Sequence, residues 1–140
     1  MSTFTRAEIA YMQGTKLARI GTVGTDGQPH MVPVTFQYNA DEDAIDVGGI
    51  AFGEGKKWRD AQRNSKVTFL LDESADGTAK AIEVRGEAEL HETGGETINP
   101  KFPNFAPEFI RIRPRRIVSW GVEDDDEDGS NFSTNARDVA

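Results

Sequence analysis

Residues 79–91 read AKAIEVRGEAELH, and they carry the clearest alternation of apolar and charged residues in the sequence. The apolar members of one face are Ile82, Val84, Ala88 and Leu90. A period of two is typical of a β-strand with one face in the core and the other in water. Gly86 lies on the apolar face, where a glycine indicates a bulge or sharp bend of the kind that a small closed barrel needs.

Further strand signals lie on both sides of this stretch. Runs rich in β-branched and aromatic residues predict strands at residues 16–23, 29–39, 44–49, 66–71, 109–112 and 117–122. Short helices are predicted at residues 5–12 and 56–63, the first of them from Thr5 and Glu8 at capping-box spacing. Strands and helices do not alternate as βαβ units would require. The predicted fold class is therefore mainly β, an antiparallel barrel of about six strands with short helices.

The domain organisation follows from length and from a change in composition. A chain of 140 residues fits one domain, and the predicted strands end at Val122. Beyond it the sequence has no apolar period, and residues 123–128 are all acidic. We predict a barrel domain over residues 1–122 and an acidic, mobile tail over residues 123–140.

Charge and composition exclude several classes of protein. The net charge of −8 argues against nonspecific binding to nucleic acid, whose affinity comes mainly from phosphate neutralisation. No apolar run approaches the roughly 18 residues of a membrane span, and residues 1–14 lack the order of a signal peptide. The absence of cysteine excludes thiol catalysis and Cys-ligated metals. We expect a cytoplasmic protein that binds neither nucleic acid nor membranes.

Familiar catalytic motifs are also missing. The sequence has no G-x-S-x-G motif, no Walker loop and no Rossmann glycine pattern. His30 and His91 are its two histidines, and each is expected to be a surface or rim residue rather than a metal ligand or a base. We therefore predict no metal site and no catalytic side chain.

Lys56 and Lys57 stand in the first turn of the helix predicted at residues 56–63. The helix dipole already makes this end positive, so two cations here are locally unfavourable. A bound anion reverses the sign of that penalty, because free helix N–H groups and lysines together form a phosphate site. Neutralisation by Glu54, with both lysines in water, is the alternative that the sequence leaves open.

A cluster of basic residues in this acidic chain suits a small anionic ligand. Four arginines fall within residues 111–116, namely Arg111, Arg113, Arg115 and Arg116. They either receive an anionic ligand or form a solvated strand face that pairs with the acidic tail. In the strand predicted at residues 29–39, Pro33 lacks an N–H group, which indicates an edge or a bulge.

The order of several motifs resembles a known family. They are GQPHMVPV at residues 27–34, RNSKV at residues 63–67 and IEVRGEA at residues 82–88. Over residues 5–122 the chain resembles the flavin and deazaflavin oxidoreductases of the split-barrel fold, which are related to pyridoxamine 5′-phosphate oxidase. The ending FIRIRPRRIVSWG at residues 109–121 is similar to the actinobacterial branch that uses the deazaflavin coenzyme F420.

This resemblance implies a set of cofactor-binding residues. The lysine that holds the cofactor phosphate falls on Lys57, with Lys56 beside it. The strand that runs along the ring system falls on Met31, Val32, Pro33, Val34 and Phe36. Arg111 and Arg113 would receive the acidic glutamate tail of F420. One departure is Gly55, where relatives often have an arginine. Either the phosphate affinity is lower for this reason, or Lys56 or Arg59 compensates.

The resemblance also implies a function. We expect a reductase that transfers a hydride from reduced F420 to a small unsaturated organic substrate, in a homodimer with its cofactor sites at the interface. An oxidoreductase of the same fold that binds flavin mononucleotide (FMN) is one alternative. A non-catalytic protein that binds flavin, deazaflavin or haem is another.

Overall fold

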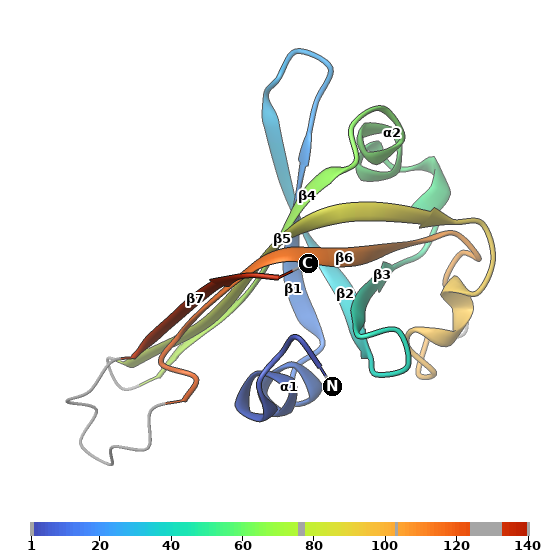
Figure 1. Ribbon diagram of the computed structural model, residues 1–140. Helices are drawn as coiled ribbons and strands as arrows, with labels where there is room; N and C mark the ends of the chain where they lie inside the picture. Colours follow the sequence, from blue (N-terminus) through green and yellow to red (C-terminus); the bar gives the residue numbers. More distant parts are fainter. Residues whose placement is uncertain (1, 76–77, 103, 124–132, 140) are drawn as a thin grey trace.

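The computed structural model describes residues 2–75, 78–102, 104–123 and 133–139. Within these ranges six antiparallel strands close into a barrel (Figure 1). They are β1 (Leu17–Val23), β2 (Pro29–Asn39), β3 (Ala44–Gly48), β4 (Lys66–Ala75), β5 (Thr78–His91) and β6 (Phe109–Trp120). The helical elements are α1 (Arg6–Gln13), α2 (Lys56–Arg63) and the 3-10 turns η1 (Phe52–Glu54) and η2 (Gly95–Thr97). The predicted mainly β antiparallel barrel is confirmed.

The barrel consists of two three-stranded sheets joined by two short seams. Strands β1 to β3 pair in sequence order, and so do β4 to β6. The first seam joins β1 to β4 through residues 19–21 and 68–70, and the second joins β3 to β6 through residues 45–47 and 110–112. Each seam has far fewer paired residues than the β4–β5 or β5–β6 ladders. The six strands form a closed barrel, but the β1–β3 sheet and the β4–β6 sheet pair with each other only over these short seams.

Apolar side chains from all six strands fill the barrel. Phe36 of β2 meets Phe69 of β4 edge to face, with ring centroids 5.0 Å apart, and both rings are buried. Ile82 and Val84 of β5 are fully buried, as the alternation in residues 79–91 predicted. Each such side chain contributes about 1.5–3 kcal/mol by leaving water.

The predicted irregularity at Gly86 is confirmed. The β5–β6 register shifts between Arg85 and Gly86, so that Arg115 of β6 is the extra residue of a bulge. Pro114, which has no N–H to donate, pairs with Gly86 beside this bulge. The bulge also explains an error in the sequence prediction: the runs at residues 109–112 and 117–122 are one strand, β6, that continues through Pro114.

We expect Gly86→Ala to destabilise the barrel. A Cβ atom at residue 86 would lie 2.3 Å from the backbone oxygen of Arg113, so one of the two strands must shift. Overpacking of this kind costs about 1–3 kcal/mol and occasionally more, which urea denaturation would measure. Gly14→Ala is the control, because its new Cβ would have 3.6 Å of clearance. An equal effect of the two substitutions would contradict the steric argument.

A seventh strand, β7 (Thr134–Asp138), pairs with the free edge of β6. The sequence predicted no strand beyond Val122, because this polar segment has no apolar period, and β7 corrects that expectation. Most of the acidic run lies outside the described residues, and the division into barrel and tail stays a prediction. Figure 1 shows β7 running along β6.

A buried ion pair joins β7 to α1. Arg137 donates from Nη2 to Oε1 of Glu8 at 2.6 Å, and Ser119 of β6 donates to Oε2 at 2.7 Å. Glu8 also completes the predicted capping box with Thr5. Burial alone raises the pKa of Glu8, but the hydrogen bonds from Arg137, Ser119 and the Thr5 backbone N–H outweigh it, so the pKa is lowered. Glu8 is therefore an ionised side chain that holds three elements together.

Each described α-helix has eight residues, and no helix in the described part of the chain is long and apolar enough to cross a bilayer.

Candidate functional site

A pocket of about 410 Å³ lies beside the first turn of α2. Its walls come from β1, β2, the end of β3 and the loop that follows η2, and Lys57 is the one charged residue among the described residues that line it. We call it the Lys57 pocket. The structure thus brings Lys57 together with Pro33 and Val34, three of the residues predicted to bind a cofactor.

Lys57 is a half-buried cation without a carboxylate partner in the described part of the chain. Its Nζ atom lies 4.8 Å from the centroid of the Phe52 ring, and burial lowers its pKa. Lys56 instead contacts Asp60, Nζ to Oδ1, at 3.5 Å. The first turn of α2 has no acidic residue, and no side chain caps it. The predicted alternative, neutralisation by Glu54, is not found, and the pocket keeps a net positive charge.

The rim of the Lys57 pocket is apolar and open to solvent. Leu17, Ile50 and Phe102 line it with exposed fractions of 62%, 65% and 52%. A cation surrounded by exposed apolar side chains suits a ligand with an anionic group and a flat apolar part.

The predicted residues of β2 divide between different environments. Pro33 and Val34 line the Lys57 pocket, whereas Phe36 is 1% exposed in the barrel core and offers a ligand only its backbone. Val32 is partly exposed, and Met31 lines a second pocket. Strand β3 pairs with β2 only from Thr35 onward. Pro33 therefore lies where β2 has a single neighbour, and the predicted edge is confirmed.

The second pocket, of about 650 Å³, lies across the outer faces of β1, β2, β4 and β5. We call it the β1–β5 groove. Its lining includes His30, Met31, Lys66, Arg85, Glu87 and Arg115. In the β1–β2 ladder Gly21 pairs with Met31, and Leu17 pairs with Thr35. Because every second residue of a strand faces the same side, the groove and the Lys57 pocket lie along one outer face of this ladder.

His30 and Asp60 form a pair that the sequence analysis missed. The Asp60 side chain is fully buried; its Oδ2 lies 2.7 Å from Nδ1 of His30 and accepts a hydrogen bond from Oγ1 of Thr22 at 2.9 Å. The hydrogen bond with His30 is the main reason why the pKa of Asp60 is lowered. No local pattern links a strand residue to a helix residue 30 positions away, so only the fold reveals the pair. No group of three or more potential metal ligands occurs among the described residues.

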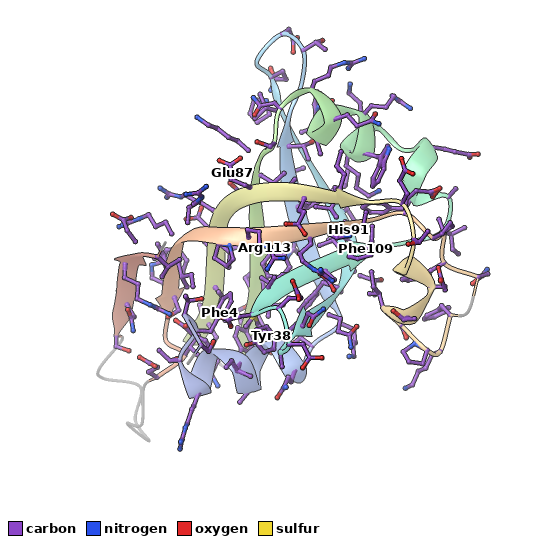
Figure 2. The ribbon with its side chains drawn as sticks, turned by 45° about the vertical axis from the view of Figure 1, so that its right-hand side comes forward. Phe4, Tyr38, Glu87, His91, Phe109 and Arg113 are labelled. Carbon is purple, nitrogen blue, oxygen red and sulfur yellow. The ribbon has the colours of Figure 1, made fainter. Side chains whose placement is uncertain are left out.

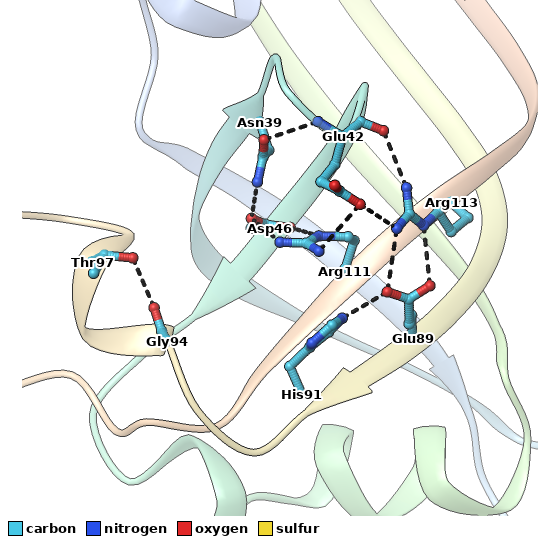
Figure 3. A network of polar contacts seen from close by, with 9 residues as sticks. All are labelled: Asn39, Glu42, Asp46, Glu89, His91, Gly94, Thr97, Arg111 and Arg113. Carbon is cyan, nitrogen blue, oxygen red and sulfur yellow. Dashed lines mark hydrogen bonds and ion pairs between the residues drawn. The ribbon is translucent and has the colours of Figure 1, made fainter.

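Arg111 and Arg113 are engaged in an ion-pair network (Figure 3). Arg111 donates from Nε to Asp46 at 2.8 Å, and Arg113 donates from Nη2 to Glu42 at 2.6 Å. Glu89 accepts from Arg113 Nε at 3.1 Å. Three carboxylates therefore face two guanidinium groups, and the network offers no net positive charge to an acidic tail. Binding of the F420 glutamate tail by Arg111 and Arg113 stays a prediction, and the charge balance of the network argues against it.

The structure also places His91, Arg115 and Arg116. His91 bonds Glu89 and stacks on Phe109, with ring centroids 4.7 Å apart (Figure 2). Arg116 pairs with Asp138 of β7. For this residue the structure agrees with the alternative prediction, in which the arginines pair with the C-terminal tail. Arg115 is exposed, lines the β1–β5 groove and has no side-chain partner within the described ranges.

Comparisons of the sequence and of the fold with known proteins show which family this chain resembles. The sequence model described as pyridoxamine 5′-phosphate oxidase matches residues 5–120. A 5a,11a-dehydrotetracycline/5a,11a-dehydrooxytetracycline reductase of Streptomyces rimosus is 36% identical over 139 residues, which cover 97% of this chain and 93% of the relative. An FAD-binding protein of Mesorhizobium loti has a TM-score of 0.61 at 20% identity, covering 83% of this chain and 91% of its own. A haem-binding protein of Mycobacterium smegmatis has a TM-score of 0.68 at 13% identity, covering 99% and 60%. At these identities the two structures show the shared fold alone.

Proposed function

The chain belongs to the pyridoxamine 5′-phosphate oxidase family, and from that premise we propose that it is a reductase that transfers a hydride from reduced coenzyme F420 to a small unsaturated organic substrate. The relative that is 36% identical is named as a reductase and matches nearly the whole chain, which supports an oxidoreductase. The observation that carries the cofactor part of the proposal is the Lys57 pocket, with its single cation and its apolar rim.

The residues of the Lys57 pocket fit a deazaflavin. Lys57 and the free N–H groups at the start of α2 would hold the phosphate. Leu17, Ile50 and Phe102 would cover apolar parts of the cofactor and exclude water. The unpaired edge of β2 at Pro33 leaves backbone groups available for polar atoms of the ring. When bound, the reduced cofactor supplies the hydride, and the protein supplies binding, orientation and shielding.

Gly55 bears on how the phosphate is held. The arginine expected there from the resemblance is absent, and Lys56 is already engaged by Asp60. Lys57 is thus the charge on which phosphate affinity rests.

FMN remains the alternative cofactor, and one observation favours it. FMN has a ring and a phosphate but no glutamate tail, and the network around Arg111 and Arg113 has no net positive charge for such a tail.

The deciding experiment is a titration of the purified protein with F420 and, separately, with FMN. We expect F420 to bind more tightly. Equal or tighter binding of FMN would replace the leading proposal with the alternative. Consumption of reduced cofactor in the presence of an enone acceptor would then separate an enzyme from a carrier, because a carrier binds without turnover.

We also propose a homodimer with the cofactor sites at its interface. Exposed apolar side chains, among them Leu17, Met31 and Ile50, gather along the outer face of β1 and β2 and the adjoining loop. Sedimentation at micromolar protein should give twice the chain mass of 15.4 kDa, and a monomer would contradict this proposal.

A further inference from the structure

We propose that Asp60 is a positioning residue for the phosphate site: its buried carboxylate, held by Thr22 and His30, fixes the first turn of α2 and so sets where Lys57 meets a cofactor phosphate. We call Asp60, Thr22 and His30 the Asp60 clamp. The inference rests on the proposed function, because it explains how that site holds the phosphate. Asp60 itself is not among the residues that line the described Lys57 pocket, so it acts through Lys57.

The Asp60 clamp joins α2 to two neighbouring strands. Thr22 of β1 and His30 of β2 are directly paired in the β1–β2 ladder. Their side chains therefore lie on the same face of the ladder, which is the face that α2 covers. Both contact Oδ2 of Asp60, Thr22 from Oγ1 at 2.9 Å and His30 from Nδ1 at 2.7 Å. One carboxylate oxygen thus connects both strands to the helix.

Asp60 is a charged side chain in the interior. It is fully buried. The hydrogen bond with His30 is the main reason why its pKa is lowered, and the hydrogen bond from Thr22 and the charge of Lys56 lower the pKa further. A buried, ionised carboxylate is tolerated only where its hydrogen-bond partners stay in place. A movement of α2 that separates Asp60 from the two strands is therefore more costly than the loss of a surface contact.

The rest of α2 provides few alternative anchors. Of its eight residues, Trp58, Asp60 and Ala61 are buried. Trp58 packs against Phe52 of η1, with ring centroids 6.1 Å apart, but η1 belongs to the same connection between β3 and β4 as α2 does. Among the described residues, every side-chain hydrogen bond between α2 and a strand is made by Asp60. The clamp is thus the polar contact that orients the helix on the barrel.

The Asp60 clamp lies close enough to Lys57 to set its position. Lys57 precedes Asp60 by one turn of α2, which is about 4.5 Å along the helix axis. The two strands that the clamp holds also line the Lys57 pocket, β1 with Leu17 and β2 with residues 33–35. The clamp therefore fixes the lysine and the strand wall of the pocket relative to each other.

Gly24 offers a way to disturb the Asp60 clamp without removing any of its polar groups. A Cβ atom at residue 24 would lie 2.5 Å from Cε1 of His30 and 3.2 Å from its Nδ1. The imidazole ring must then move, and the nitrogen that contacts Asp60 moves with it. Gly24→Ala therefore loosens the clamp while all three of its members remain.

The test measures how much the phosphate contributes to binding by the full-length protein, as the dissociation constant of riboflavin divided by that of FMN. The two probes differ by the phosphate alone. Asp60→Asn should lower this ratio by about 5- to 10-fold, a part of the roughly 10- to 150-fold that one charge-assisted contact supplies. Gly24→Ala should change the ratio in the same direction, and the affinity for riboflavin should stay the same in both variants.

Two results for Asp60→Asn would overturn the proposal. An unchanged ratio would show that phosphate binding does not depend on the clamp. A raised ratio would show that Asp60 acts by holding Lys56, which it contacts at 3.5 Å, away from the phosphate.

Glu8→Gln is the matched control. Glu8 is also a fully buried carboxylate that holds a helix to strands, but its partners are Ser119 of β6 and Arg137 of β7. Glu8→Gln should therefore lower the melting temperature and leave the ratio unchanged. A fall in the ratio as large as that in Asp60→Asn would assign the effect to general instability and overturn the proposal.

A double-mutant cycle shows whether Asp60 acts through Lys57. In the Lys57→Gln background, adding Asp60→Asn should change the ratio by less than about twofold, because the lysine that the clamp positions is already gone. A purely structural role would give the same loss in both backgrounds. Additive effects of the two substitutions would therefore overturn the proposal.

The inference and the proposed function fail in different ways. The same ratio is measured with F420 and 8-hydroxy-5-deazariboflavin, which has the ring and the ribityl chain of F420 without the phosphate. If FMN binds more tightly than F420, the cofactor assignment changes, while the effect of Asp60→Asn on the FMN ratio still supports the clamp. If the unmodified protein binds neither phosphate-bearing cofactor more tightly than its phosphate-free counterpart, no phosphate site exists at Lys57 and the inference is overturned.

Discussion

Lys57→Gln should weaken F420 binding by about 10- to 150-fold, which corresponds to the loss of one charge-assisted contact of about 1.5–3 kcal/mol. Lys57 is the one charged residue lining its pocket among those the structure describes, and Lys56 is held by Asp60, so no neighbour replaces it. Glutamine keeps much of the aliphatic stem beside Phe52, which limits the change to the charge. Titration of cofactor fluorescence would measure the two dissociation constants.

Arg63→Gln is the control for this prediction. It removes a cation from the last turn of the same helix, at the opposite end from the pocket. Cofactor affinity should therefore stay within about twofold, since a surface charge at this distance is screened by salt. If Lys57→Gln binds F420 as tightly as the unmodified protein does, Lys57 is not the phosphate anchor.

Glu8→Gln should lower the free energy of unfolding by about 3 kcal/mol, which is the lower end of the usual cost of removing one partner of a buried ion pair. The melting temperature should fall by roughly 10 °C. Glu8 is fully buried, while the Arg137 side chain keeps 25% exposure, so Arg137 is left only partly solvated and without its partner. Thermal unfolding would measure the loss. The control is Arg19→Gln, whose pair with Asp72 is 47% and 46% exposed and should contribute at most about 1 kcal/mol.

The same pair sets a pH dependence of stability. Because the pKa of Glu8 is lowered in the folded protein, its contribution is present above the unfolded-state value of about 4.3 and is lost as the pH falls through the folded-state value. The stability difference between the unmodified protein and Glu8→Gln should therefore shrink in acid. A constant difference from pH 7 to pH 3 would contradict the linkage.

The elements that could be predicted from the sequence are those with strong local signals. The alternation in residues 79–91 and the glycine within it predicted both β5 and its bulge, and the capping pair Thr5 and Glu8 predicted α1. The helix predicted at residues 56–63 is α2 with the same bounds. In each case the residues that decide the structure are close together in the chain.

The features that could not be predicted depend on partners far away in the sequence. Strand β7 has no apolar face and is held by the edge of β6 and by Glu8, 129 residues before Arg137. The arginines of β6 look like an anion site in sequence, but Arg111 lies directly across the β3–β6 seam from Asp46. The pairing of His30 with Asp60 likewise exists only once α2 packs on the barrel.

The two halves of the closed barrel share few paired residues, because both seams are short. Local openings in a protein follow the places where few contacts must break, and their free energy lies well below that of global unfolding. The β1–β5 groove straddles the β1–β4 seam, because Gly21 of β1 and Thr68 of β4 are both paired there and both line the groove. Motion of one half against the other on the microsecond to millisecond scale would therefore widen the groove, and it would also displace Phe102 and Phe105, which line the Lys57 pocket from the connection between β5 and β6. The width of the groove and the width of the Lys57 pocket would therefore change together.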